Sequence, residues 1–107
     1  MLVTTTPILE GKKIIEYKGP VFAQVVRGFA IGQGFLDGLR AVVADRSKGH
    51  EELISQIRTE ALNELEQKAR DTGANALVGV VVDVEAVSLR ERPMILGKAS
   101  GTAVTVE

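Results

Sequence analysis

The sequence predicts an α+β fold in which an antiparallel sheet packs against two helices in two layers. Three features carry this prediction: a long apolar stripe at helical spacing, a valine-rich stretch that alternates in polarity, and a final extended stretch with small residues on one face. Extended segments come first, helical segments follow, and a hairpin comes last. That order is typical of an α+β domain and unlike the alternation of a parallel fold.

Extended structure is predicted for the first part of the chain. Leu2–Thr6 is short and rich in β-branched residues, and Lys12–Lys18 and Val21–Arg27 are the next extended pieces. Gly19 and Pro20 stand between these two pieces. Proline has no N–H for a ladder hydrogen bond, so Pro20 is expected at a strand start, a bulge or an edge. A bent strand and a tight hairpin both fit this pattern.

Two helices are predicted in the middle of the chain. Apolar residues at helical spacing predict a short helix over residues 35–44. A longer helix is predicted over residues 50–72, where one stripe is apolar and the opposite side is mostly charged. Gly73 is expected to supply the left-handed residue that caps this helix. The apolar stripe consists of Leu53, Ile54, Ile57, Ala61, Leu62, Leu65 and Ala69.

The last two predicted strands, over residues 75–89 and 94–106, are joined by a turn that contains Pro93. In the first of them the even-numbered apolar residues from Ala76 to Ala86 are expected to form the core face, with Asp83 and Glu85 on the other face. The second strand has an apolar face made mostly of small residues, which allow another element to approach closely. These are Ile95, Gly97, Ala99, Gly101 and Ala103.

Composition limits the class of protein. The 107 residues are expected to form a single domain over 1–107, and 13 basic against 14 acidic residues give a net charge of −1, which disfavours nucleic acid as a partner. The chain has no cysteine, which suits a reducing compartment. The N-terminus does not resemble a secretory signal, and the longest apolar run is far shorter than the ~20 residues that span a bilayer. A soluble, cytoplasmic protein without a membrane partner is expected.

Three groups of residues are candidates for chemistry. Gly32 and Gly34 precede a predicted helix whose N-terminal amides suit a phosphate, although loop flexibility and close helix packing explain the glycines as well. His50, the only histidine, adjoins Glu51, but neighbouring helix residues point apart and cannot meet on one metal ion without another chain. Asp83 and Glu85 share a strand face at a spacing that suits paired carboxylates, but a solvent-facing strand edge is the favoured explanation, since scattered acids are typical of surfaces.

Four motifs resemble the YbjQ-like family of small proteins, in the same order along the chain. They are Thr4-Thr5-Thr6; Asp45-Arg46-Ser47 with Gly49 and Glu51; Gly73-Ala74-Asn75-Ala76 with Val78-Gly79-Val80; and Ala99-Ser100-Gly101-Thr102-Ala103-Val104. The resemblance implies a dodecin-like α+β subunit that assembles as a pentamer and has no established activity. It also brings the label of heavy-metal binding, which a chain with no cysteine and one histidine supports poorly.

The leading hypothesis from the sequence is a non-enzymatic homo-oligomer, a pentamer by resemblance, that binds a small anionic ligand at clefts between subunits. The residues expected to bind this ligand are Gly32, Gly34, Asp37, Arg40, Arg46 and Ser47. The alternative is metal binding or storage at subunit contacts through His50 and Glu51. The third hypothesis is an acid–base enzyme that uses Asp83 and Glu85. The sequence identifies no cofactor.

Overall fold

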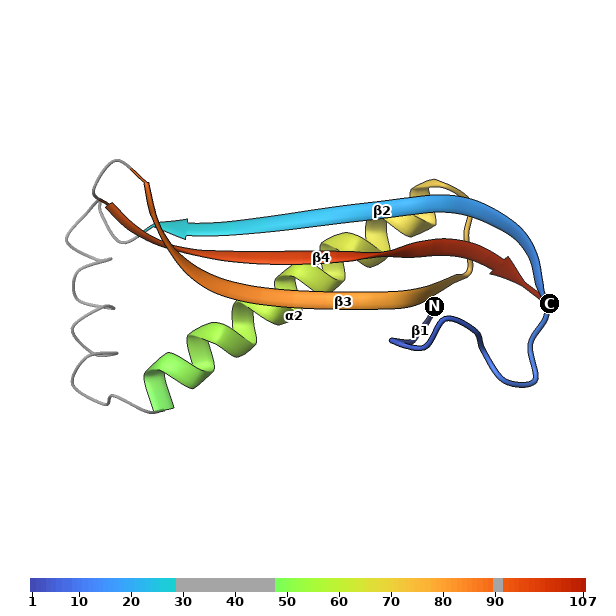
Figure 1. Cartoon of the computed structure of the whole chain (residues 1–107), viewed down its shortest axis with the longest axis horizontal. Coiled ribbons are helices and arrows are strands. Elements are labelled where there is room, and N and C mark those ends of the chain that lie inside the picture. Colours follow the sequence, from blue (N-terminus) through green and yellow to red (C-terminus); the bar gives the residue numbers. More distant parts are fainter. Residues whose placement is uncertain (29–47, 90–91) are drawn as a thin grey trace.

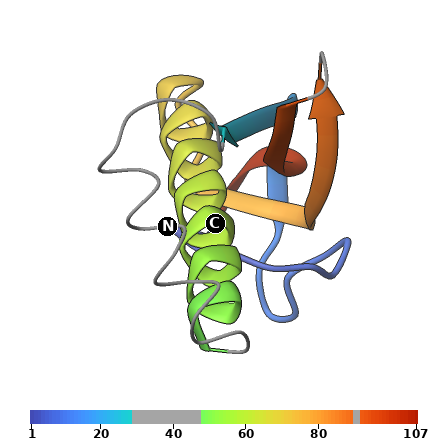
Figure 2. The ribbon, with the colours of Figure 1, turned by 90° about the vertical axis from the view of Figure 1, so that its left-hand side faces the viewer.

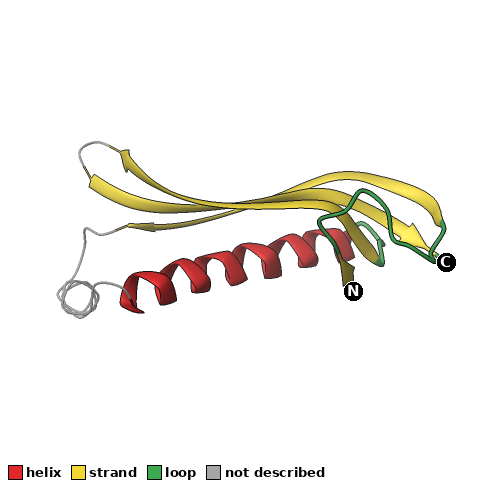
Figure 3. Cartoon of the chain, turned by 60° about the horizontal axis from the view of Figure 1, so that its bottom comes forward, coloured by secondary structure: helices red, strands yellow, loops and turns green. Residues whose placement is uncertain are grey.

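The computed structural model describes residues 1–28, 48–89 and 92–107, which form one helix and one four-stranded sheet (Figure 1). The predicted helix over residues 35–44 lies outside the described residues. The elements are β1 (Leu2–Val3), β2 (Ile14–Gly28), α2 (Lys48–Asp71), β3 (Ala76–Leu89) and β4 (Arg92–Val106). The helix α2 lies along one face of the sheet, so the two-layer α+β prediction is confirmed (Figures 2 and 3).

The sheet has the strand order β1-β3-β4-β2, so the last strand in the chain, β4, lies between β3 and β2. Both of these pairs are antiparallel, as predicted. The short strand β1 runs parallel to β3, with Leu2 beside Ala76, which makes the sheet mixed rather than wholly antiparallel. Among the described strands, β2 and the greater part of β3 form the two edges of the sheet.

The strand β2 is one continuous element and not two pieces joined by a hairpin. Its pairing with β4 shifts register between Ile14 and Glu16 and again between Tyr17 and Gly19. Gly19 has a φ of 114°, which accommodates the second irregularity, and Pro20 follows on this edge strand as proline requires. The bent strand is therefore the correct alternative of the two that the sequence left open.

The helix α2 matches its prediction to within two residues at each end. Its C-terminus closes with Gly73 at a φ of 88°, where the Gly73 N–H donates to the Arg70 carbonyl and the Ala74 N–H donates to the Ala69 carbonyl. These two bonds form a Schellman motif and confirm the predicted cap. The stripe that includes Ile57 and Leu65 is buried against the sheet. No helix among the described residues is long and apolar enough to cross a membrane.

The small residues of β4 make room for this helix. The alternate residues from Ile95 to Ala103 face α2 and are buried, as predicted. A Cβ atom built on Gly97 would overlap the Ile57 side chain, and one built on Gly101 would lie 3.0 Å from Cγ2 of Val80. The close neighbours that these two glycines admit therefore belong to the same chain: the helix α2 at Gly97 and the strand β3 at Gly101.

The strand β3 changes faces in its middle. The register passes from Val78 opposite Thr102 to Val81 opposite Ser100, so β3 contains one extra residue, and Gly79 at this bulge has a φ of 61°. An extra residue inverts the alternation of side chains beyond it. The prediction of one even-numbered core face is therefore wrong before the bulge.

Before the bulge Leu77 faces α2, while Ala76 and Val78 face the opposite side. After the bulge the even-numbered residues Val80, Val82 and Val84 face α2. Ala76 and Val78 join a second, smaller cluster with two residues of β4, and Leu9 and Ile14 pack against it. The N-terminal loop thus covers one end of the sheet face that α2 does not reach.

Candidate functional site

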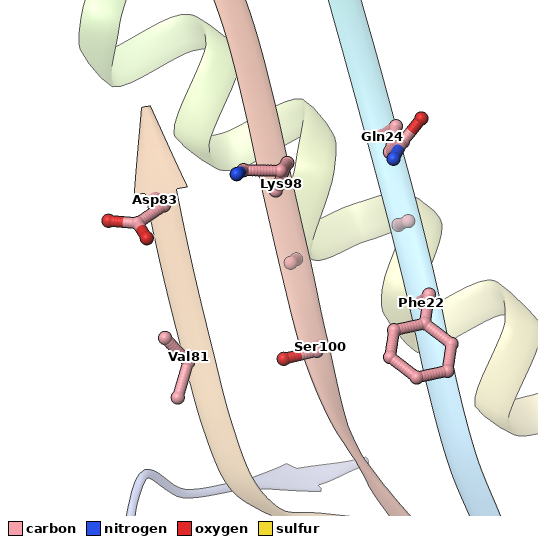
Figure 4. A pocket seen from close by; sticks show the side chains of 8 residues that line it. Phe22, Gln24, Val81, Asp83, Lys98 and Ser100 are labelled. Atoms are coloured by element: carbon pink, nitrogen blue, oxygen red, sulfur yellow. The ribbon is translucent and has the colours of Figure 1, made fainter. Parts of the chain in front are cut away.

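The face of the sheet that points away from α2, called here the outer face, holds the most distinct surface feature of the described residues. After the bulges, residues directly opposite one another on the three long strands point to the same side. One such row consists of Phe22, Ser100 and Val81. The next row consists of Gln24, Lys98 and Asp83, as Figure 4 shows.

A shallow hollow of about 270 Å³ lies between these two rows. The Phe22 ring and the Val81 side chain stand on either side of the small Ser100 at one end, and the Lys98 and Asp83 side chains stand at the other (Figure 4). The hollow is open to solvent, because Phe22 is 62% exposed and Val81 is 59% exposed. Its lining comprises Phe22, Ala23, Gln24, Val81, Asp83, Lys98, Ala99 and Ser100.

The charges of the hollow are organised around Lys98. Its ammonium group forms an ion pair with Glu85 at 2.8 Å and lies on the strand directly opposite Asp83. The hydrogen bond to Glu85 and the negative charge of Glu85 raise the pKa of Lys98 above 10.5, and Asp83 adds a smaller effect in the same direction. The one ammonium of the hollow is therefore already matched by carboxylates, which makes the hollow a poor site for an anion.

A titration tests this arrangement. Replacing Glu85 with Gln is expected to lower the pKa of Lys98 towards 10.5, because the variant removes the main cause of its elevation. The measurement is an NMR titration of the Lys98 Cε and Hε signals above pH 9. The matched control is Glu64→Gln, which removes the partner of Lys68 on α2 and should leave the Lys98 titration unchanged.

The sign of the related stability effect follows from the direction of the shift. Because the pKa of Lys98 is raised in the folded state, its ion pair with Glu85 stabilises the fold below pH 10.5. This stabilisation is lost as the pH rises through the pKa of Lys98 in the folded state. If Lys98 titrates at the same pH in the wild-type protein and in the Glu85→Gln variant, the ion pair between Lys98 and Glu85 does not form in solution.

The residues predicted to bind an anionic ligand lie outside the described part of the chain. These are Gly32, Gly34, Asp37, Arg40, Arg46 and Ser47. His50 and Glu51 lie in the first turn of α2, and Glu51 is exposed. The described residues contain no cluster of three or more His, Cys, Asp or Glu side chains that could hold a metal ion.

The donor chemistry of the chain does not fit a soft heavy metal. Soft ions select thiolate and thioether sulfur, and the sequence contains no cysteine and two methionines. The carboxylates that the structure does bring near one another, Asp83 and Glu85, have Lys98 as their neighbour, and an ammonium group competes with a cation for the same oxygens. The described part of the chain thus offers neither the sulfur ligands of such a site nor a cluster of three ligating side chains.

Asp83 and Glu85 do lie on one face of β3, as their spacing predicts. Glu85 is held by Lys98, and the side chains of both partners of this ion pair are close to half exposed. Acid–base catalysis depends on positioned groups in a site from which water can be excluded. An open ion pair on a sheet surface lacks this feature, so the structure gives no support to the enzyme hypothesis.

Sequence reasoning did not place Lys98, Gln24 and Phe22 around the same hollow as Asp83. Their proximity depends on the register of three strands, and β2 is distant from β4 in the sequence. One signal was present: residues that alternate with the small face of β4 must point to the other side, and Lys98 is the one charged residue among them between Met94 and Val106.

A family model described as "Putative heavy-metal-binding", named YbjQ, matches residues 1–107 of the chain. The chain belongs to the YbjQ family. This confirms the resemblance inferred from the four motifs. The family description names a function that the donor chemistry of this member does not support.

Relatives of this YbjQ-family chain match it over almost its full length. A UPF0145 protein of Pasteurella multocida is 46% identical over 106 residues, covering 99% of both chains. A UPF0145 protein of Listeria monocytogenes is 45% identical over 107 residues, covering all of this chain and 96% of the relative. A crystal structure of a protein of unknown function from Pediococcus pentosaceus, assigned to the DUF74 family, has a TM-score of 0.64 at 19% identity and covers 100% of this chain and 98% of that one. This last likeness concerns the fold alone.

Proposed function

We propose that this YbjQ-family protein is a non-enzymatic homo-oligomer, in which neighbouring copies cover the outer face and the open edges of the sheet. The proposal concerns assembly first, because assembly is what the described surface supports best. Five copies are expected from the family resemblance. Clefts between copies are the place where a small ligand would bind.

The observation that carries the proposal is the amount of surface that one chain leaves exposed. A compact monomer of 11.4 kDa exposes about 5,800 Å². This chain exposes 7147 Å². Its radius of gyration is 16.8 Å, whereas about 13 Å is typical of a compact domain of 107 residues. The exposed area of this chain above that of the compact monomer lies between one and two times the roughly 800 Å² that each partner contributes to a standard interface.

The exposed surface is also apolar where the sheet is bare. On the outer face, Tyr17 is 69% exposed, Phe22 62%, Val81 59% and Val26 49%. Single exposed apolar residues are normal on monomers, but large aromatic and branched side chains together on an uncovered sheet face mark an interaction surface. The α2 helix cannot cover them, because it lies on the other face (Figure 3).

Native mass spectrometry, carried out on protein purified from its own host without chelators, tests the proposal. The wild-type protein is expected to show one species of five chains, and Phe22→Asp and Val81→Asp are each expected to shift the population to monomers, because each places a charge on the contact surface. Thr59→Asp, at an exposed site on α2, is the control and should keep the wild-type subunit count. A monomeric wild-type protein at micromolar concentration would overturn the proposal.

The ligand class stays a prediction from the sequence. The anion hypothesis depends on Arg46 and the other residues outside the described part, and the outer-face hollow does not replace them, since its one ammonium is paired with Glu85. Metal binding through His50 and Glu51 rests on the family description. The same mass spectrum addresses both, because a retained metal ion or organic anion adds a characteristic mass to the assembly.

A further inference from the structure

The two edges of the sheet differ in how they are protected against another strand. An unpaired edge offers a row of N–H and C=O groups, and proteins block such edges with bulges, proline and lysine. The first half of β2 has all three: two register shifts, Pro20, and Lys68 of α2, whose Nζ donates to the Phe22 carbonyl at 2.8 Å. The second half of β2, from Ala23 to Gly28, pairs regularly and contains no bulge or proline, and the side-chain hydrogen bond to a carbonyl there comes from a residue of the strand itself, Arg27, to Val26 at 3.3 Å.

The outer edge of β3 has no such protection beyond its bulge. The N-terminal segment occupies this edge as far as Val80, whose N–H donates to the Thr4 carbonyl. From Val81 to Leu89 the pairing of β3 with β4 is regular. Along this stretch no main-chain hydrogen bond from another described element reaches the edge of β3 that points away from β4. Nine extended residues measure about 30 Å, which is long enough to pair with a complete strand.

The charges of β3 indicate which strand can pair there. Asp83 and Glu85 lie on the outer face of this stretch, and the stretch has no basic residue. A second β3 would bring two more carboxylates beside them, and like charges on adjacent strands are destabilising. The open half of β2 has no acidic residue, and its outer-face Gln24 has an amide that can donate to a carboxylate.

We propose that the edge of β3 over Val81–Leu89 pairs with the edge of β2 over Ala23–Gly28 in the next copy. This inference rests on the proposed homo-oligomer and names the surfaces that join its subunits. The contact is heterologous, because two different edges meet, and each copy uses one of each. Heterologous contacts close into rings of any number of subunits, odd numbers included, when the rotation between copies allows.

Cysteine cross-linking tests the pairing, and the chain suits it because it has no cysteine of its own. Double variants combine Cys at position 83, 85 or 87 of β3 with Cys at position 24 or 26 of β2, all of them on the outer face. Within one chain β4 separates these strands by about 9.6 Å, and a disulfide needs Cα atoms within about 7 Å. A disulfide between β3 and β2 must therefore join two copies.

With mild oxidation by diamide, at least one double variant is expected to give a ladder of covalent species on a non-reducing gel, ending at the native subunit number. The matched single-Cys variants should yield no band above a dimer. An intact oligomer in which no combination gives such a ladder would overturn the edge pairing and leave the proposed oligomer standing. A wild-type monomer in native mass spectrometry would overturn both.

Amide hydrogen exchange on the unmodified protein gives an independent readout. Every second amide from Val82 to Leu89 points to the outer edge, and these amides should exchange at least tenfold more slowly in the oligomer than in folded Val81→Asp monomers. Equal exchange rates in the two states would contradict the edge pairing.

Discussion

Leu77→Asp is expected to destabilise the protein by about 4 kcal/mol or more, because it places a carboxylate in the main core. Leu77 is fully buried and packs with the cluster beneath α2. Val81→Asp, four residues further along the same strand, is expected to change the stability of the folded chain by about 1 kcal/mol or less, because Val81 is 59% exposed. Strict alternation would place both residues on one face, and the bulge at Gly79 separates them.

The measurement is urea unfolding followed by far-UV circular dichroism at one protein concentration. Leu77→Asp should lose most of the helical signal before urea is added or show a large fall in the unfolding midpoint. Val81→Asp should keep the wild-type helical signal even when its subunit count falls. Similar effects of the two substitutions on folding would show that the bulge is not where the structure places it.

Gly97→Ala is expected to destabilise the protein by about 1–3 kcal/mol through overpacking. A Cβ atom at this position overlaps the Ile57 side chain and lies 3.8 Å from the Cβ atom of Ala61. Because Gly97 is buried on the central strand and Ile57 is 1% exposed, neither element can move apart without loss of packing elsewhere.

The double variant Gly97→Ala with Ile57→Ala is the control. Ile57→Ala alone should cost about 2–5 kcal/mol because it leaves a cavity, and the added methyl group at position 97 would then fill part of that cavity. The double variant should therefore be more stable than the sum of the two single effects predicts, by about 0.5–3 kcal/mol. Strict additivity in chemical denaturation would contradict the contact between β4 and α2.

The parts of the fold that depend on local sequence were predictable. The helix α2 follows from the apolar stripe through Ile57 and Leu65, and its end follows from Gly73, since glycine adopts a positive φ without steric cost. The buried small face of β4 follows from strict alternation around Gly97 and Gly101, and its close neighbours are elements of the same chain, α2 at Gly97 and β3 at Gly101.

The parts that depend on pairing between distant segments were not predictable. Gly79 within a valine run is compatible with a plain strand, and the bulge appears only when Val78 and Val81 are set against their partners on β4. The same holds for the outer-face hollow. Lys98 and Asp83 meet because β3 and β4 share a register, and the register of a hairpin depends on its turn, whose exact bounds the sequence leaves open.

The position of β4 has a consequence for the order in which the fold forms during synthesis. Both long neighbours of β4, the strands β2 and β3, precede it in the chain, so neither can complete its pairing until β4 has left the ribosome. The strand β2 is synthesised before β3, so this valine-containing segment is without a strand partner for the longest time. Pro20, which interrupts the row of main-chain donors in the finished fold, is already present in this unpaired strand and there limits its pairing with other nascent chains.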